Sequence, residues 1–242
     1  MRQMHAGRAV VVRIFRNLLK NNLINLPRAV KVAVVGGSEM EPELSIIAEL
    51  GLEFDVVVFG ISSESEYLDL NLLENFPIGH EGRYHLVICC QVLEHLYNVK
   101  NSLENLDRLL SPGGYVWINV PTSNKKHLSP KYYSAGYQPD LIQKLIEPFG
   151  VELVEMGDVG SKRLYHMTHK QQYWPSQLEH RYPFLRGIHN GLSYFILRFL
   201  KNIPRNIQAQ TWSPKIVHGT EFSTDTYFFG RGSYLPRLSK RS

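Results

Sequence analysis

Cysteine is almost absent from this sequence of 242 residues, which contains only the neighbouring pair Cys89 and Cys90. The pair lies in a short apolar run that predicts a buried strand, and adjacent strand residues point to opposite faces of a sheet. We therefore expect no disulfide between them. Two free thiols favour a reducing compartment, so the sequence predicts a cytoplasmic protein.

Long apolar runs are also missing, and no run reaches the roughly 20 residues that a membrane-spanning helix needs. Near the amino terminus, Arg13 and Arg16 interrupt the only apolar stretch, which argues against a signal peptide. We expect residues 7–23 to form an amphipathic helix that packs on the side of the domain.

Acidic residues are absent between Glu179 and Glu221. Residues 39–110 hold 14 acidic and three basic residues, a net charge of −11, whereas the rest of the chain holds 24 basic and eight acidic residues, a net charge of +16. A basic half of this kind favours an anionic small molecule, an anionic membrane surface or nucleic acid as a partner. The alternative is a basic face that meets only solvent.

The complete Gly-x-Gly-x-x-Gly sequence of dinucleotide-binding loops is missing as well. Gly36, Gly37 and Ser38 instead follow the apolar run 30–35 and precede a helix start with proline and acids. A strand, a glycine turn and a helix in this order form the usual shape of a nucleotide-binding loop. Glycine lets the backbone approach a ligand closely there. An ordinary strand-to-helix turn is the alternative interpretation.

The most informative segment is the strand–helix–strand pattern of residues 84–121. Residues 86–90 predict a strand buried on both faces, and apolar residues at helical spacing predict a helix over 99–110. Ser-Pro-Gly-Gly at 111–114 predicts the end of that helix, and another apolar strand follows. Such a unit is a parallel crossover, so its polar tip at 91–95 lies where open α/β sheets bind ligands.

This pattern, with Val-Leu-Glu-His at 92–95 and Ser-Pro-Gly-Gly after the helix, resembles the second half of a class I S-adenosylmethionine-dependent methyltransferase. The resemblance extends over residues 30–157, with a weaker match near the carboxyl terminus. It implies an α/β fold with a Rossmann-like seven-stranded sheet, mostly parallel, and helices on both faces. Residues 226–229 would belong to the antiparallel last strand.

The same resemblance implies the cofactor S-adenosyl-L-methionine and a set of residues around it. These cofactor-side candidates follow two of the predicted strands or lie in a short predicted strand at residues 67–71, and they are Gly36, Gly37, Ser38, Asp69, Leu70, Gln91 and Glu94. Asp69 has the alternative role of capping a turn. No metal site is expected, because His166 and His169 have the spacing of a metal pair but lack a nearby third ligand.

A polar and aromatic segment follows the strand that ends at Val120, beside the expected cofactor site. Loops in that position carry binding and catalysis in α/β enzymes. The candidate catalytic groups are His127, Tyr132 and Tyr133 in this segment and His95 at the polar tip, because each can accept a proton or orient a hydroxyl. A packing lid is the alternative role for the tyrosines, and capping of the following helix is the alternative for His95.

We expect a methyltransferase core made of residues 30–157 and 206–230, preceded by residues 1–29 with the amphipathic helix. An inserted cap that binds the acceptor is expected at residues 158–205, where periodicity is lost and aromatic, histidine and basic residues gather. Basic helices in this part would also suit a peripheral contact with a membrane surface.

The predicted reaction transfers a methyl group to an oxygen or nitrogen of a small-molecule or glycan acceptor. The basic excess favours an anionic acceptor such as a sugar or sugar phosphate, and the resemblance to methyltransferases of surface-glycan pathways implies a role in polysaccharide biosynthesis. No specific nucleic acid is expected as a partner. Two alternatives stay open: a non-catalytic relative, because Val34, Ser38, Met40 and Gly60 depart from the family pattern, and a nicotinamide-dependent sugar enzyme.

Overall fold

The computed structural model of the chain describes residues 6–123, 131–160, 215–216 and 223–233. Its α-helices are α1 (Ala6–Asn22), α2 (Pro42–Glu49), α3 (Val99–Leu109) and α4 (Pro139–Ile146). Its strands are β1 (Ala29–Val35), β2 (Glu53–Gly60), β3 (Glu66–Tyr67), β4 (Tyr84–Cys90), β5 (Leu110–Pro121), β6 (Val151–Gly160), β7 (Lys215–Ile216) and β8 (Ser223–Gly232). Short 3-10 helices cover Leu23–Asn25, Leu93–His95 and Glu147–Phe149.

The strands form one mixed sheet in the order β3-β2-β1-β4-β5-β8-β6-β7. Strands β1 to β5 pair in parallel, and β8 runs antiparallel between β5 and β6. The predicted seven-stranded sheet with an antiparallel last strand is therefore confirmed, and the two-residue β7 extends it beyond β6. The strand order reverses between β1 and β4, so the crevice at which such sheets bind ligands lies at the carboxyl ends of these two strands.

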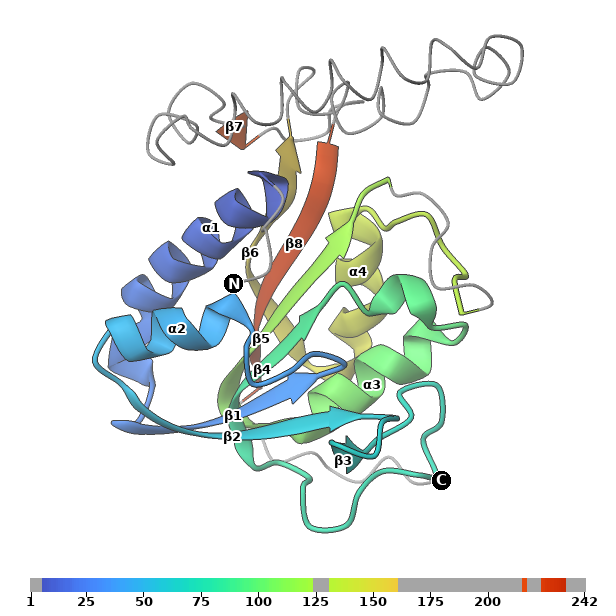
Figure 1. Cartoon of the computed structure of the whole chain (residues 1–242), viewed down its shortest axis with the longest axis horizontal. Helices are drawn as coiled ribbons and strands as arrows, with labels where there is room; N and C mark the ends of the chain where they lie inside the picture. Colours follow the sequence, from blue (N-terminus) through green and yellow to red (C-terminus); the bar gives the residue numbers. More distant parts are fainter. Residues whose placement is uncertain (1–5, 124–130, 161–214, 217–222, 234–242) are drawn as a thin grey trace, which may run out of the picture.

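Helices cover both faces of the sheet, α1 and α2 on one face and α3 and α4 on the other (Figure 1). The two faces follow from alternation along the strands: Val34 and Leu86 lie in the core under α1 and α2, and Val35 and Val87 lie in the core under α3 and α4. Each fully buried valine or leucine contributes about 1.5–3 kcal/mol relative to exposure. The apolar strands that the sequence predicts are thus buried from both sides.

Local signals explain how the helices begin. Glu41 has extended backbone at the N-cap of α2, and Pro42 occupies the first turn, where its missing N–H is not needed. Asn98 caps α3, because its side chain accepts a hydrogen bond from the backbone N–H of Asn101 at 3.2 Å. The suggested helix-capping role of His95 is therefore wrong.

The Ser-Pro-Gly-Gly sequence at 111–114 differs from its prediction as a simple turn. Helix α3 ends just before it, at Leu109, but the four residues form a bulge inside β5, where the register between β4 and β5 shifts. Gly113 has φ +73°, and a Cβ on Gly114 would lie 2.8 Å from the carbonyl oxygen of Tyr84. The glycines permit a close strand contact there in addition to ending the helix.

One predicted boundary also shifts. Strand β6 continues to Gly160, so residues 158–160, which the sequence assigned to the cap, are part of the sheet. The other residues of the predicted cap, 161–205, lie outside the described part of the chain. None of the helices in the described ranges has the length and apolar character that crossing a bilayer would require.

Candidate functional site

The loops that follow β1 and β4 meet at the crevice between these strands. Gly36 directly follows β1 with φ +72°, and a Cβ at this position would lie 2.6 Å from Cγ2 of Val92 in the loop after β4. The backbone N–H of Gly36 donates to the carbonyl of Phe59 in β2 at 2.7 Å. Gly36 is thus held against the ends of both neighbouring strands, and the structure brings the predicted halves of the cofactor site together.

The side chains of Glu41 and Val34 occupy the space beside Gly37. A Cβ on Gly37 would lie 2.8 Å from Oε1 of Glu41 and 2.9 Å from Cγ1 of Val34. Ser38 closes the turn, because its backbone carbonyl accepts from the N–H of Glu41 at 3.1 Å and its hydroxyl accepts from the N–H of Met40 at 3.3 Å. The structure therefore places protein side chains beside Gly37, and the predicted cofactor contact of Gly37 stays a prediction.

Gln91 marks the carboxyl end of β4 with an unusual backbone. Its φ of +57° is the only positive value of a non-glycine residue in the described ranges. Its side-chain amide donates to Oδ1 of Asn119 at 3.0 Å and to Oδ1 of Asp225 at 3.5 Å. A left-handed glutamine costs about 1–2 kcal/mol, and backbone strain of this kind gathers at functional sites. Gln91 therefore remains a strong candidate.

Glu94 is fully buried in the 3-10 helix that follows β4. Its backbone carbonyl accepts hydrogen bonds from the N–H groups of Tyr133 at 2.9 Å and Ser134 at 3.2 Å. These bonds tie the segment after β5 to the tip of β4. The ring of Tyr133 packs edge-on against Tyr97 with centroids 5.8 Å apart, so the packing role suggested for this tyrosine is present.

His95 lies between Glu94 and the segment after β5. Its Nδ1 is 2.6 Å from the backbone carbonyl of Lys131, which can only accept, so Nδ1 carries a proton and donates. Its Nε2 lies 3.8 Å from Oε1 of Glu94, and its ring centroid is 6.0 Å from that of Tyr132. Burial, and then the Glu94 carboxylate, raise the pKa of Tyr132, so this phenol stays neutral near pH 7. His127 lies outside the described residues.

Asp69 has the turn-capping role that was its alternative. Its Oδ1 accepts from the backbone N–H and from the side-chain amide of Asn71, each at 2.9 Å. Asn71 in turn accepts from the N–H groups of Tyr97 and Asn98 after β4. Leu70 is buried in the core under α3 and α4. The predicted cofactor contacts of Asp69 and Leu70 stay predictions.

Sequence reasoning missed a buried ion cluster on the α1 side of the crevice. Arg8 of α1 forms a two-point pair with Glu43, both contacts at 2.7 Å, and a single contact with Glu41 at 3.3 Å. Its Nη1 also donates to Oδ1 of Asn119 in β5 at 3.0 Å. The acids at 41 and 43 resemble ordinary first-turn residues of α2, and their partner lies on a helix far away in sequence, so nothing local indicates the pairing.

Glu43 has further partners from the central strands. Its Oε1 accepts from the indole N–H of Trp117 at 3.1 Å and lies 3.5 Å from Sγ of Cys90. Burial raises the pKa of the Cys90 thiol, although Arg8 opposes this effect, so the sulfur stays protonated and donates to the carboxylate. The Glu43 carboxylate is therefore fixed from α1, β4 and β5.

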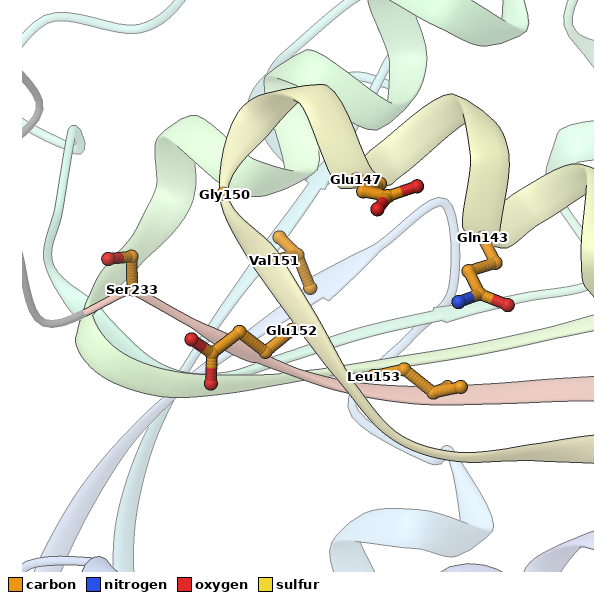
Figure 2. Close-up of a pocket in the computed structure, with 7 residues that line it drawn as sticks. All are labelled: Gln143, Glu147, Gly150, Val151, Glu152, Leu153 and Ser233. Atoms are coloured by element: carbon orange, nitrogen blue, oxygen red, sulfur yellow. The ribbon is translucent and has the colours of Figure 1, made fainter.

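A separate groove of about 360 Å³ lies at the opposite edge of the sheet, beside the amino end of β6 (Figure 2). Its lining consists of Gln143, Glu147, Gly150, Val151, Glu152, Leu153 and Ser233. No predicted site residue lies there. Within the described residues, no three His, Cys, Asp or Glu side chains are placed to hold a metal ion. His166 and His169 lie outside these residues.

Comparison with known proteins supports the methyltransferase interpretation. The family model described as a methyltransferase domain matches residues 35–213. No curated protein matches the sequence significantly. Nothing in these matches favours a nicotinamide-dependent enzyme or a glycan pathway.

Solved structures share the fold at low identity. A Galdieria sulphuraria protein described as a sarcosine dimethylglycine methyltransferase has a TM-score of 0.55 at 11% identity and covers 94% of this chain and 87% of its own. The cyclase SpnF has a TM-score of 0.52 at 11% identity, covering 93% and 82%. A SAM-dependent methyltransferase of Archaeoglobus fulgidus has a TM-score of 0.50 at 12% identity, covering 91% and 94%. Identities this low show the fold alone.

Proposed function

Because this chain belongs to the methyltransferase-domain family and is thus an S-adenosylmethionine-dependent methyltransferase, we propose that it methylates an oxygen or nitrogen of a small anionic acceptor. One observation carries the location of the reaction: the loops after β1 and β4 touch through Gly36 and Val92 at the switch point of the sheet. The candidate catalytic groups at the tip of β4 face the same edge.

The residues at this crevice fit S-adenosylmethionine. The tight turn at Gly36 exposes bare backbone, and Arg8 and Glu41 offer opposite charges that match the zwitterionic amino-acid end of the cofactor. When bound, the cofactor supplies a methyl group on a positively charged sulfur. The acids Glu41 and Glu94 give the crevice the negative charge that a sulfonium favours. Methyl transfer needs mainly alignment and exclusion of water, so few side chains have to react.

We assign the proton step to His95. The hydrogen bond from its Nδ1 to the Lys131 carbonyl fixes the ring and leaves Nε2 to take the proton of an acceptor hydroxyl or ammonium. The Glu94 carboxylate, 3.8 Å from Nε2, then stabilises the imidazolium. Tyr132 acts as a neutral hydrogen-bond donor that orients the acceptor. His127 and Tyr133 stay candidates for contacts with the acceptor.

The acceptor class is inferred from charge. The excess of bases outside residues 39–110 supports an anionic acceptor, with a sugar phosphate as the first choice and a step of polysaccharide biosynthesis as the setting. The free thiols of Cys89 and Cys90 support a cytoplasmic location. The alternative role of these basic residues is contact between basic helices and an anionic membrane surface.

The direct test is transfer of a labelled methyl group from S-adenosylmethionine to matched pairs of sugar phosphates and neutral sugars. We expect the phosphates to be methylated at lower KM, and Arg181→Ala or Arg186→Ala to raise KM for phosphates without changing the affinity for S-adenosylhomocysteine. An equal increase in KM for charged and neutral acceptors in these variants would show that the two arginines do not bind the anionic group of the acceptor.

The role of His95 has its own test. His95→Gln should lower kcat about 100-fold or more, while S-adenosylhomocysteine still binds with unchanged affinity. An unchanged kcat would exclude His95 as the base.

A further inference from the structure

We propose that Arg8 and Glu41 together bind the amino-acid end of the cofactor. Arg8 would bind the carboxylate of the cofactor, and Glu41 would bind its ammonium group. This assignment rests on the proposed function and names residues that no sequence motif indicates. It makes α1, which the sequence presents as a helix packed on the side of the domain, part of the cofactor site.

The position of the pair is the first argument. The Glu41 carboxylate fills the space beside Gly37, directly after β1. Arg8 reaches Asn119 of β5 at 3.0 Å, and the same Oδ1 of Asn119 accepts from Gln91 at the end of β4 at 3.0 Å. The pair therefore lies between the carboxyl ends of β1, β4 and β5, and the side chain of Asn119 links it to Gln91, the residue with strained backbone at the end of β4.

The orientation of the cofactor is the second argument. In open α/β sheets the ribose of a bound nucleotide lies near the end of β2, and β2 and β4 flank β1 on opposite sides. The sulfur joins the ribose to the amino-acid chain. With the ribose at β2, the amino-acid end extends toward β4 and α1, where Arg8 and Glu41 lie.

The unequal partners of Arg8 are the third argument. Glu43 is fully buried and fixed by two contacts with Arg8 at 2.7 Å and by the Trp117 indole, so it is a permanent partner. Glu41 has one contact at 3.3 Å, and 21% of its side chain is exposed. Burial raises the pKa of Glu41, and Arg8 opposes this effect only in part. Glu41 is therefore the partner that a ligand carboxylate can replace on Nη2.

Charge balance agrees with this exchange. Arg8, Glu41 and Glu43 together carry a formal charge of −1, and a zwitterionic amino-acid group leaves that sum unchanged. The ligand carboxylate takes the place of Glu41 on Arg8, and the released Glu41 accepts the ligand ammonium. Both new contacts are charge-assisted hydrogen bonds in a site that is largely shielded from water.

The test compares two ligands by isothermal titration calorimetry on the full chain. S-Adenosylhomocysteine has the amino-acid end, whereas 5′-methylthioadenosine lacks it. Arg8→Met should weaken S-adenosylhomocysteine about 10- to 100-fold and leave the affinity for 5′-methylthioadenosine unchanged. Arg16→Met is the matched control, because Arg16 lies on the same helix and pairs with Glu49 at 3.4 Å with both side chains about half exposed. It should change neither affinity.

Glu41→Gln provides a second variant that keeps the pair of Arg8 with Glu43, in case Arg8→Met fails to fold. It should weaken S-adenosylhomocysteine and leave 5′-methylthioadenosine unaffected. Equal weakening of both ligands in these variants would show that the pair only supports the loop, and unchanged binding of both would exclude any contact; either result overturns the proposal. A wild-type protein that binds neither ligand would overturn the proposed function as well.

Discussion

Gly36 has a backbone position that any other residue would strain, and it also lies against Val92. Gly51 has a similar φ of +76° but nothing within 4 Å of its missing Cβ. Gly51→Ala should therefore lower the free energy of unfolding by about 1 kcal/mol from strain alone. Gly36→Ala should cost about 1–3 kcal/mol more, because the new methyl group overlaps Val92.

Urea unfolding of both variants measures this difference. Adding Val92→Ala to Gly36→Ala should recover part of the extra loss, since it removes the overlapping methyl groups. Equal losses for Gly36→Ala and Gly51→Ala would mean that the loops after β1 and β4 are not in contact.

The buried thiols predict how stability depends on pH. Burial raises the pKa of Cys89 above the ordinary 9.0, and Glu94 adds to this effect. The unfolded chain ionises this thiol near pH 9, whereas the folded chain does not, so the contribution to stability is complete below pH 9 and is lost above it. Between pH 8 and pH 10 the wild type should lose about 1 kcal/mol more than Cys89→Ala. Identical pH slopes in urea titrations would show that the thiol is not shielded.

Single residues also show where sequence reasoning ends. The placement of Gly36, Gln91 and Glu94 at one edge of the sheet could be predicted, because Gly36 and Gln91 directly follow recognisable strands, Glu94 lies three residues after Gln91, and the carboxyl ends of parallel strands form one edge. Arg8 and Glu43 could not, because their pairing depends on how α1 docks, which no local pattern records. Gly37 was assigned to the ligand, but the side chain that fills its space is Glu41, four residues later.

At the scale of elements, a substitution in the bulge of β5 tests the pairing between β4 and β5. Gly114→Ala would place a methyl group 2.8 Å from the backbone carbonyl of Tyr84, which cannot move without breaking the strand pairing. We expect a loss of about 1–3 kcal/mol in the free energy of unfolding. Gly232→Ala is the matched control, because its nearest neighbour would be 3.6 Å away, and its effect should be within about 1 kcal/mol of zero. Similar thermal unfolding of the two variants would argue against the bulge.

Elements with strong periodicity were predictable, and irregular ones were not. A continuous apolar run identified β4, which is buried on both faces, and apolar residues at helical spacing identified α3, because its one buried face imposes that period. The Ser-Pro-Gly-Gly sequence ends α3 as expected. The bulge that this sequence also forms depends on the opposing Tyr84 in β4. The sequence of residues 111–114 alone does not show which strand residue lies opposite.

At the scale of the whole molecule, strand order fixes the site more firmly than any motif does. The glycine sequence after β1 is incomplete, yet the reversal of order between β1 and β4 places its loop beside the tip of β4. The parallel crossover was predictable from the succession of strands and helices, whereas the seven-stranded sheet with its antiparallel last strand was implied by the resemblance to class I methyltransferases. The acceptor was not predictable, because it depends on charged side chains whose arrangement the sequence does not give.

A crystal structure with bound S-adenosylhomocysteine would show directly where the cofactor binds. We expect the ligand at the carboxyl ends of β1 and β4, with its sulfur facing Gln91 to Glu94 and with contacts to the backbone of Gly36. Ligand bound instead in the groove beside Gly150 and Glu152, or no ligand and no calorimetric heat at millimolar concentration, would exclude this binding site.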